Sequence, residues 1–375
     1  MNTTFLRRAI VPGVAAIALA ASLAACGSSD DDTTSASGGD SSASAGGSAT
    51  NLSGSLAGGG SSAQEKAQDI WRAGFGASNP DAKITYESVG SGTGRDNFIS
   101  GSYKFAGSDS AMESDELTSA KKTCGSDPVE FPVFISPIDV IYNLKGVDSL
   151  KLDAPTIAKI FNGTITTWDD PAIKALNPDA SLPSTKIQPV HRSDSSGTTD
   201  NFTDYLHQAS GGAWKDDHSS DWPLQGGAAA KGTDGVVSSV KSGDGTISYA
   251  DDSGVQGQGL GIAQIKVGSQ FVTPSADGAA AGLAASQVAT GTPATVLQYN
   301  INRKTTDPKT YPIFMASYEI ACSTYSDSGT AALVKGFLSY MISDQGQAAA
   351  AKNAFSAPLP ADISAKEQAI VDKIS

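Results

Sequence analysis

The chain has 375 residues and a formal net charge of -13, because 39 Asp and Glu residues face only 26 Lys and Arg residues. A surface with this balance makes nucleic acid a poor partner. An anion site in such a protein must be local, built from helix ends and a well-held arginine rather than from a broad positive field.

The first 25 residues have the pattern of a secretory signal peptide. Arg7 and Arg8 precede an Ala-rich apolar run that is too short for a membrane span. The run ends in Leu-Ala-Ala followed by Cys26. This ending resembles the lipobox of bacterial lipoproteins, which predicts that Cys26 becomes the lipidated first residue after cleavage. The alternative is an ordinary signal peptide in which Cys26 has no special role.

Residues 26–51 consist almost entirely of Gly, Ser, Ala, Thr and Asp. Such a segment cannot form a core, and we expect a flexible tether with an end-to-end distance of roughly 25–30 Å. About 325 residues remain beyond it, which is more than one hydrophobic core usually serves and suggests two domains.

The chain has three cysteines. If Cys26 carries lipid, Cys124 and Cys322 are left, and two remaining cysteines of an exported protein most often pair. We therefore expect a disulfide rather than free thiols, with a stabilisation of about 4–5 kcal/mol from the long closed loop.

The first candidate loop is a Gly- and Ser-rich stretch at residues 58–63. Glycines allow a ligand to approach the backbone, and Ser62 and the Ala63 amide would donate at the start of the following helix. The alternative is plain linker. One face of the predicted helix carries Ala67, Ile70, Trp71 and Gly74.

The second candidate loop follows a predicted strand at residues 83–89. Residues 90–95 then turn the chain into a helix, and their glycine spacing does not fit the dinucleotide-binding fingerprint. Ser91 is the candidate anion donor here, against the alternative of ordinary turn chemistry.

The third candidate loop ends a short apolar segment at residues 105–110 and differs in presenting a carboxylate. A carboxylate repels an anion unless the ligand carries a proton, so Asp109 would accept a hydrogen bond from protonated phosphate but not from sulfate. The alternative is a surface residue that caps a helix beginning near Ser114.

The fourth candidate loop, residues 191–199, connects a short apolar strand at residues 187–190 to a helix. The first N–H groups of a helix have no internal partner and can receive an oxyanion directly. Arg192 would add a two-pronged hydrogen bond, and Asp194 is placed to orient its guanidinium group. The predicted helix face carries Phe202, Tyr205, Leu206 and Ala209.

Together the four loops resemble the phosphate-binding protein of the bacterial high-affinity phosphate ABC importer, over residues 52–360. Residues 192–199 are similar to the family's Arg-x-Asp-x-Ser-Gly-Thr loop, and residues 160–178 are similar to its second-domain helix and turn. The resemblance implies a lipid-anchored, extracytoplasmic protein that captures inorganic phosphate and delivers it to permease subunits. It implies no enzymatic activity, no cofactor and no metal.

The resemblance also implies the ligand shell and the role of Asp194, which would brace Arg192. The first loop departs from the family pattern, because related proteins often have Thr-Phe-Pro there. The implied phosphate ligands are Ser62, the Ala63 amide, Ser91, Asp109, Arg192, Ser196, Gly197 and Thr198.

The fold implied by the resemblance is the α/β, two-lobed type II periplasmic-binding-protein fold. Each lobe would be a sheet flanked by helices, and hinge strands at residues 131–142 and 311–320 would cross between the lobes. Lobe one would hold residues 52–136 and 311–375, including both paired cysteines, and lobe two residues 137–310. Ligand binding would close the lobes.

Other functions remain open at this point. Ser196, His191 and Asp194 suggest a serine hydrolase, but one short loop cannot easily form a relay and the Gly-x-Ser-x-Gly elbow is missing. His191, His207 and His218 lack metal-ligand spacing. The serious alternative is a binding protein for sulfate, molybdate or a phosphonate, and a surface sensor or adhesin would show the same cleft.

Overall fold

The computed structural model describes residues 51–375. The predicted signal peptide, the predicted lipidation site Cys26 and the predicted tether up to residue 50 lie outside the described residues. Within residues 51–375, no helix combines the length and apolar character needed to cross a bilayer.

The described chain is built around one large mixed sheet that contains two parallel groups of strands. β1 pairs in parallel with β2 and β3, and β6 pairs in parallel with β7 and β8. Antiparallel β14 and β4 lie between the two groups, and β9 pairs with β4. In sheet order the strands are β2 (Ala82–Ser88), β1 (Gly54–Gly60), β3 (Phe105–Ser108), β14 (Phe314–Cys322), β4 (Pro128–Asn143), β8 (Thr246–Asp251), β6 (Gln188–Arg192) and β7 (Ala228–Ala230), with β9 (Gly261–Ile262) off this path.

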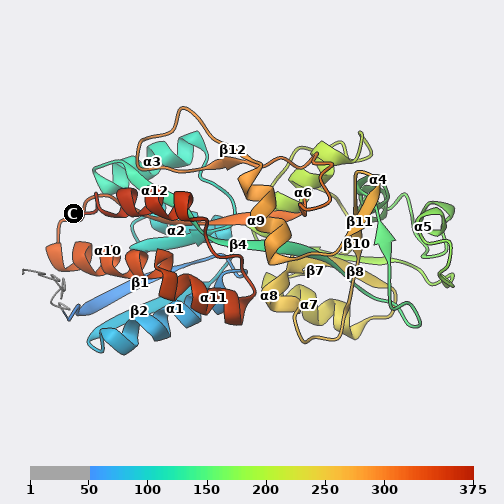
Figure 1. The fold of residues 1–375 in the computed structure, drawn as a ribbon, viewed down its shortest axis with the longest axis horizontal. Helices are drawn as coiled ribbons and strands as arrows, with labels where there is room; N and C mark the ends of the chain where they lie inside the picture. The colour runs from blue at the N-terminus through green and yellow to red at the C-terminus, as the bar shows by residue number, and fades with distance from the viewer. Residues whose placement is uncertain (1–50) are drawn as a thin grey trace, which may run out of the picture. The chain divides into compact units, whose positions relative to one another are not determined.

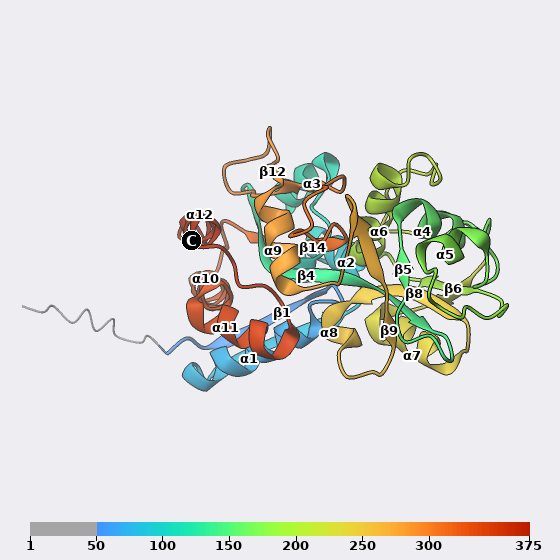
Figure 2. The same ribbon diagram turned by 45° about the vertical axis from the view of Figure 1, so that its right-hand side comes forward.

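Strand β4 joins the two groups of strands. Its first part, up to Pro137, pairs with β14, and its second part, from Ile138 to Asn143, pairs with β8. Figure 2 shows β4 running from the region beside β14 towards β8 and β9. All but the last of its 16 residues are buried, as expected for a strand covered on both faces. The strand therefore makes the crossing expected at residues 131–142, and the two-lobed type II fold is confirmed.

Helices cover both groups of strands (Figure 1). Beside β1 and β2, α1 packs on α11 and β2, and α10 packs on β1. Beside β6 and β8, α7 packs on both strands and α4 packs on α6. The first set of helices is α1 (Glu65–Ser78), α2 (Ser91–Ile99), α3 (Ser114–Cys124), α10 (Ser328–Ile342), α11 (Asp344–Ala354) and α12 (Ala361–Val371). The second set is α4 (Ala154–Phe161), α5 (Pro171–Leu176), α6 (Gly197–Ala209), α7 (Gly232–Ser242) and α8 (Asp252–Val255).

The segment before the predicted lobe boundary at residue 310 contacts strands on both sides of that boundary. Helix α9 (Ala276–Ala284) packs on both β4 and β14. Glu130 of β4 donates its N–H to the Thr295 carbonyl at 3.0 Å and accepts from Leu297 N at 2.7 Å. Residues 295–297, which the prediction placed in lobe two, thus pair with the first part of β4. Two small sheets complete the fold, β5 (Lys151–Leu152), β10 (Gln264–Val267) and β11 (Gln270–Val272) in one, and β12 (Gln287–Val288) and β13 (Tyr299–Asn300) in the other.

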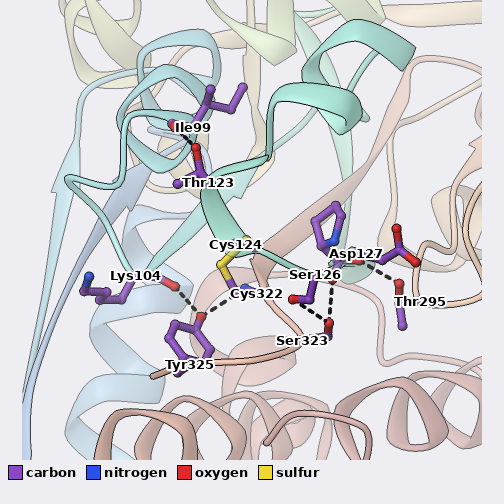
Figure 3. The surroundings of a disulfide bond; sticks show 11 residues. Ile99, Lys104, Thr123, Cys124, Ser126, Asp127, Thr295, Cys322, Ser323 and Tyr325 are labelled. Carbon is purple, nitrogen blue, oxygen red and sulfur yellow. Dashed lines mark hydrogen bonds between the residues drawn. A yellow bond between two sulfur atoms is a disulfide. The ribbon is translucent and has the colours of Figure 1, made fainter. Parts of the chain in front are cut away.

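The predicted disulfide between Cys124 and Cys322 is confirmed (Figure 3). It joins the end of α3 to the end of β14 and closes a loop with a sequence separation of 198. Beside it, Tyr325 accepts from Cys322 N at 3.0 Å and donates to the Lys104 carbonyl at 2.7 Å. The bridge therefore fixes the end of β14 to the end of α3.

Candidate functional site

The four predicted loops meet where the two parallel groups of strands end. Loops one and three follow the C-terminal ends of β1 and β3, and loop four follows β6. Ligand sites of open α/β sheets form beyond these strand ends. The two sides touch directly, because Gly92 N donates to the Ser195 carbonyl at 3.2 Å and Thr198 Oγ1 donates to Asp109 Oδ2 at 3.2 Å.

Loop four turns β6 into α6 as its pattern predicts. Ser196 is the N-cap residue, with extended backbone angles, and its hydroxyl oxygen accepts from Thr199 N at 3.2 Å. The helix begins at Gly197, so the amides of Gly197 and Thr198 belong to its first turn, where no earlier carbonyl is placed to accept them. These amides and the positive end of the helix dipole face the meeting point of the loops.

Arg192 is buried at the start of the same loop and held by Asp194. Its Nε donates to Asp194 Oδ1 at 2.8 Å and its Nη2 donates to Oδ2 at 2.5 Å, which leaves the N–H groups of Nη1 for a ligand. Gly232 N also donates to Asp194 Oδ1 at 3.0 Å. Burial raises the pKa of Asp194, but the hydrogen bonds and charge of Arg192 outweigh burial and lower it below its ordinary value. The pair is therefore ionised at neutral pH.

Asp109 is the buried carboxylate of the site, with 3% of its surface exposed. Two hydroxyl groups, Ser61 Oγ and Ser317 Oγ, each donate to Oδ1 at 2.6 Å. Burial raises the pKa of Asp109, and the bonds from Ser317 and Ser61 together with the charge of Arg192 offset only part of this effect. Ser61 and Ser317 are functional candidates that the sequence reasoning missed.

Loops two and four approach so closely that glycine is required in both. Gly90 has a φ of +98°, and a Cβ atom there would lie 2.7 Å from Asp194 Oδ2. A Cβ atom on Gly197 would lie 2.8 Å from Ser91 Oγ and 2.7 Å from Asp109 Cβ. Ser91 Oγ accepts from Asp109 N at 3.1 Å, so its own proton is free for another acceptor.

Loop one is engaged within the protein. Ala63 N donates to Ser61 Oγ at 3.0 Å, and Ser62 Oγ accepts from Thr233 N at 3.1 Å. Thr233 lies in the first turn of α7, so Ser62 bridges the two sides of the site. Thr233 was not predicted as a site residue. A signal was present, because α7 begins with Gly232-Thr233 just as α6 begins with Gly197-Thr198.

His191, one of the residues that suggested a serine hydrolase, contacts backbone carbonyl oxygens and Trp222. His191 contacts the carbonyl oxygens of Arg192 at 2.8 Å and Gly226 at 3.2 Å, and its ring stacks on Trp222. His191 therefore has no hydrogen bond to Ser196 within the described chain. Between residues 51 and 375, no group of three or more His, Cys, Asp and Glu side chains is arranged to hold a metal ion.

A second polar connection, also missed by the sequence reasoning, links the site to the start of β14. Asn201 Nδ2 donates to the carbonyls of Asp109 and Gly197, both at 2.8 Å. Arg303 Nη2 donates to Asn201 Oδ1 at 2.5 Å, and Nη1 donates to the carbonyl of Phe314, the first residue of β14, at 2.7 Å.

Comparison with known proteins identifies the family. Residues 39–345 match the family described as the PBP superfamily domain. The phosphate-binding protein PstS 3 of Mycobacterium tuberculosis is 38% identical over 316 residues, which cover 84% of this chain and 85% of that protein. A high-affinity periplasmic phosphate-binding protein solved with bound phosphate, PfluDING, has a TM-score of 0.69 at 23% identity and covers 84% of this chain and 93% of its own. A putative phosphate ABC transporter substrate-binding protein from Clostridium perfringens, also with bound phosphate, has a TM-score of 0.60 at 17% identity and covers 82% and 100%. By sequence and fold, the chain belongs to the PBP superfamily and, within it, to the family of PstS phosphate-binding proteins.

Proposed function

We propose that this protein captures inorganic phosphate between its two lobes and delivers it to the permease subunits of an ABC importer. The observation that carries the proposal is a buried carboxylate, Asp109, in the same site as a buried guanidinium group, Arg192, and the N-terminus of α6. Relatives named as phosphate-binding proteins, matched over 85% of their length, support the same assignment.

The donors on the lobe-two side would hold the anion's oxygens. Arg192 offers Nη1 because Asp194 occupies its other edge, and a pre-oriented guanidinium group gives strong charge-assisted hydrogen bonds. The first-turn amides of Gly197 and Thr198 and the hydroxyl of Ser196 add neutral donors. Because the chain is strongly acidic, these local groups supply the attraction that the overall field cannot.

The lobe-one side would discriminate between anions that carry a proton and anions that do not. Phosphate near neutral pH keeps at least one proton, which Asp109 accepts, whereas sulfate keeps none and opposes the carboxylate with its own charge. Ser91, whose proton is not used by Asp109, is the lobe-one donor to the anion. Ser62 completes the proposed shell once the anion competes with Thr233 for it, and the Ala63 amide does so by donating to the anion and to Ser61 together.

Calorimetric titration of the purified protein with phosphate, sulfate and arsenate at several pH values tests this function. We expect phosphate to bind and sulfate to bind far more weakly at neutral pH. Sulfate binding as tight as phosphate binding would instead support a general oxyanion-binding protein.

We further propose that the protein is held outside the cytoplasm by lipid on Cys26, after removal of residues 1–25. Labelling of expressing cells with a palmitate analogue, followed by membrane fractionation, tests this anchor. The wild type should carry the label and sediment with membranes, and Cys26→Ala should do neither. Equal labelling of the two proteins would contradict the anchor without touching the phosphate site.

A further inference from the structure

A buried chain of hydrogen bonds begins at Asp109 and runs into lobe one. Ser317 Oγ lies 2.6 Å from Asp109 Oδ1, Gln64 Nε2 lies 2.7 Å from Ser317 Oγ, and Gln68 Nε2 lies 2.9 Å from Gln64 Oε1. Gln68 Nε2 also donates to Glu319 Oε2 at 3.1 Å. Burying polar groups costs free energy because each gives up its hydrogen bonds to water, and the bonds along this chain offset that cost.

The direction of the bond from Ser317 is fixed by Gln64. Gln64 Nε2 also lies 3.0 Å from the Tyr318 carbonyl, which can only accept, so this end of the amide must be the nitrogen. The nitrogen can only donate to Ser317 Oγ. Ser317 has a single proton, and its remaining partner is Asp109 Oδ1. Ser317 is therefore held as a donor to the carboxylate.

The direction of the bond from Ser61 is fixed by the backbone. Ser61 Oγ accepts from Ala63 N at 3.0 Å and from Gln64 N at 3.3 Å, which fills its two acceptor positions. Its proton therefore points to Asp109 Oδ1 at 2.6 Å. Oδ1 thus receives two hydroxyl donors, whereas Oδ2 receives only the hydroxyl of Thr198 at 3.2 Å from the other side of the site.

We propose that Ser61, Ser317 and Gln64 are specificity-determining residues, because they hold Asp109 as an ionised acceptor whose Oδ2 receives the ligand's proton. This inference rests on the proposed function and names the groups that make the site select a protonated tetrahedral anion. Without the two donors, burial would favour the neutral acid. A neutral Asp109 would donate a proton, and it would then accept a fully ionised anion such as sulfate.

The other titratable groups that face Asp109 do not replace the hydroxyls. Arg192, from β6, favours the ionised carboxylate, but it is shared with Asp194. Tyr86, from β2, uses its hydroxyl to donate to the Ser61 carbonyl at 2.9 Å. Asp251, at the end of β8, has a pKa of about 7, raised mainly by burial, and the charge of Asp109 adds to this rise. Among these groups, only Arg192 and the hydroxyls favour the charge on Asp109.

The experiment compares Ser61→Ala, Ser317→Ala, the double variant and Gln64→Met with the wild type. The ratio of the sulfate Kd to the phosphate Kd is measured by calorimetry at several pH values from 5.5 to 8.5. In the wild type we expect a large ratio across the range. In the double variant we expect the ratio to fall at least tenfold at the acid end and to recover as the pH rises and Asp109 ionises. In the single variants the ratio should fall in the same way but only at lower pH. The effect of Gln64→Met should be the smallest.

Two controls separate specificity from damage. Ser248→Ala removes a buried serine of β8 that donates to the Val190 carbonyl at 2.8 Å and does not contact Asp109, so its ratio should match the wild type at every pH. Ser317→Thr keeps a hydroxyl donor and should restore selectivity. Circular dichroism checks folding, and Ser317→Ala, which leaves the bonds of Ser61 to the Ala63 and Gln64 amides in place, carries the test if the double variant does not fold.

The results distinguish the inference from the function on which it rests. A wild type that does not bind phosphate overturns the proposed function. A wild type that binds phosphate, with folded Ser61→Ala and Ser317→Ala variants whose ratio equals the wild-type ratio at every pH, overturns the inference alone.

Discussion

Replacing Arg192 by Ala tests the site most directly, because the structure gives the size of the effect. The side chain is buried and donates two hydrogen bonds to Asp194, at 2.8 and 2.5 Å. Its removal deletes the charged ligand donor and leaves Asp194 with the single donor Gly232 N. Truncating one partner of a buried charge pair in a binding site costs about 2–5 kcal/mol of affinity. We therefore expect the phosphate Kd of Arg192→Ala to exceed the wild-type Kd by a factor between about 30 and a few thousand.

A double variant separates the two parts of that cost. Arg192→Ala leaves a negative charge beside the anion, and Arg192→Ala with Asp194→Ala removes it. We expect the double variant to bind phosphate more tightly than Arg192→Ala, because the repulsion and the unpaired burial of Asp194 both disappear. Asp194→Ala alone should be milder, because it keeps the guanidinium group but not its orientation.

Calorimetry or competition with labelled phosphate measures these affinities. Arg72→Ala is the matched control, because Arg72 also pairs with an aspartate, Asp69, but on the surface of α1 away from the loops. It should bind like the wild type. An Arg192→Ala affinity within about tenfold of wild type, or a double variant weaker than the single, would refute the placement of the anion beside Nη1.

Three further predictions concern Asp109, the disulfide and the buried carboxylate of Asp139. Asp109→Asn should reduce the selection against sulfate, and unchanged discrimination in a competition titration would contradict proton matching. Replacing Cys124 and Cys322 by Ser should lower the free energy of unfolding by about 5 kcal/mol in the chain-entropy model, measured by urea unfolding, and a loss under about 1 kcal/mol would contradict it. Burial and the nearby charges of Asp252 and Asp251 raise the pKa of Asp139 well above its ordinary value. The folded protein therefore holds a proton that the unfolded chain releases, so this residue's contribution to stability is lost as the pH rises above about 4, by up to about 1.4 kcal/mol per pH unit. Asp139→Asn should flatten that dependence in urea titrations at pH 5 and 8, and an unchanged slope would assign the proton elsewhere.

The parts of the site that were predicted from sequence have local signals. Loop four combines a short apolar strand, an N-cap serine and a helix whose buried face includes Phe202, Tyr205 and Leu206. Every one of these signals lies within about 20 residues, where hydrophobic period and capping chemistry apply. The crossing strand was predicted from the family resemblance instead, and the structure shows that it is buried along almost its whole length, as expected for a strand covered on both faces.

The partners of Asp109 could not be predicted in this way. Ser317 lies 208 residues from Asp109 in the sequence, and only the pairing of β14 with β3 brings the two together. Ser61 lies in the predicted first loop, but the loop's Gly-Ser composition does not show which hydroxyl turns inward. The contact of residues 295–297 with Glu130 is a single bridge without a strand pattern, so the sequence could not predict it.

The contacts that hold the two sides of the site together are polar hydrogen bonds, and a ligand can therefore shift the balance between open and closed states. The carboxylate of Asp109 accepts a hydrogen bond from Thr198, and its carbonyl accepts one from Asn201. Arg303 donates both to Asn201 and to the carbonyl of the first residue of β14. Water can replace such bonds when the lobes separate, so each contributes only about 0.5–1.5 kcal/mol to closure. An anion bound to Arg192 and the start of α6 on one side would also bond to Asp109 and Ser91 on the other side, and only these second bonds require both sides to meet. The ligand shifts the balance by this difference in affinity between open and closed states. Asp109 receives bonds from α6, so if it selects the protonated anion as we propose, we expect a ligand that it repels also to lose the contacts that would keep the lobes closed.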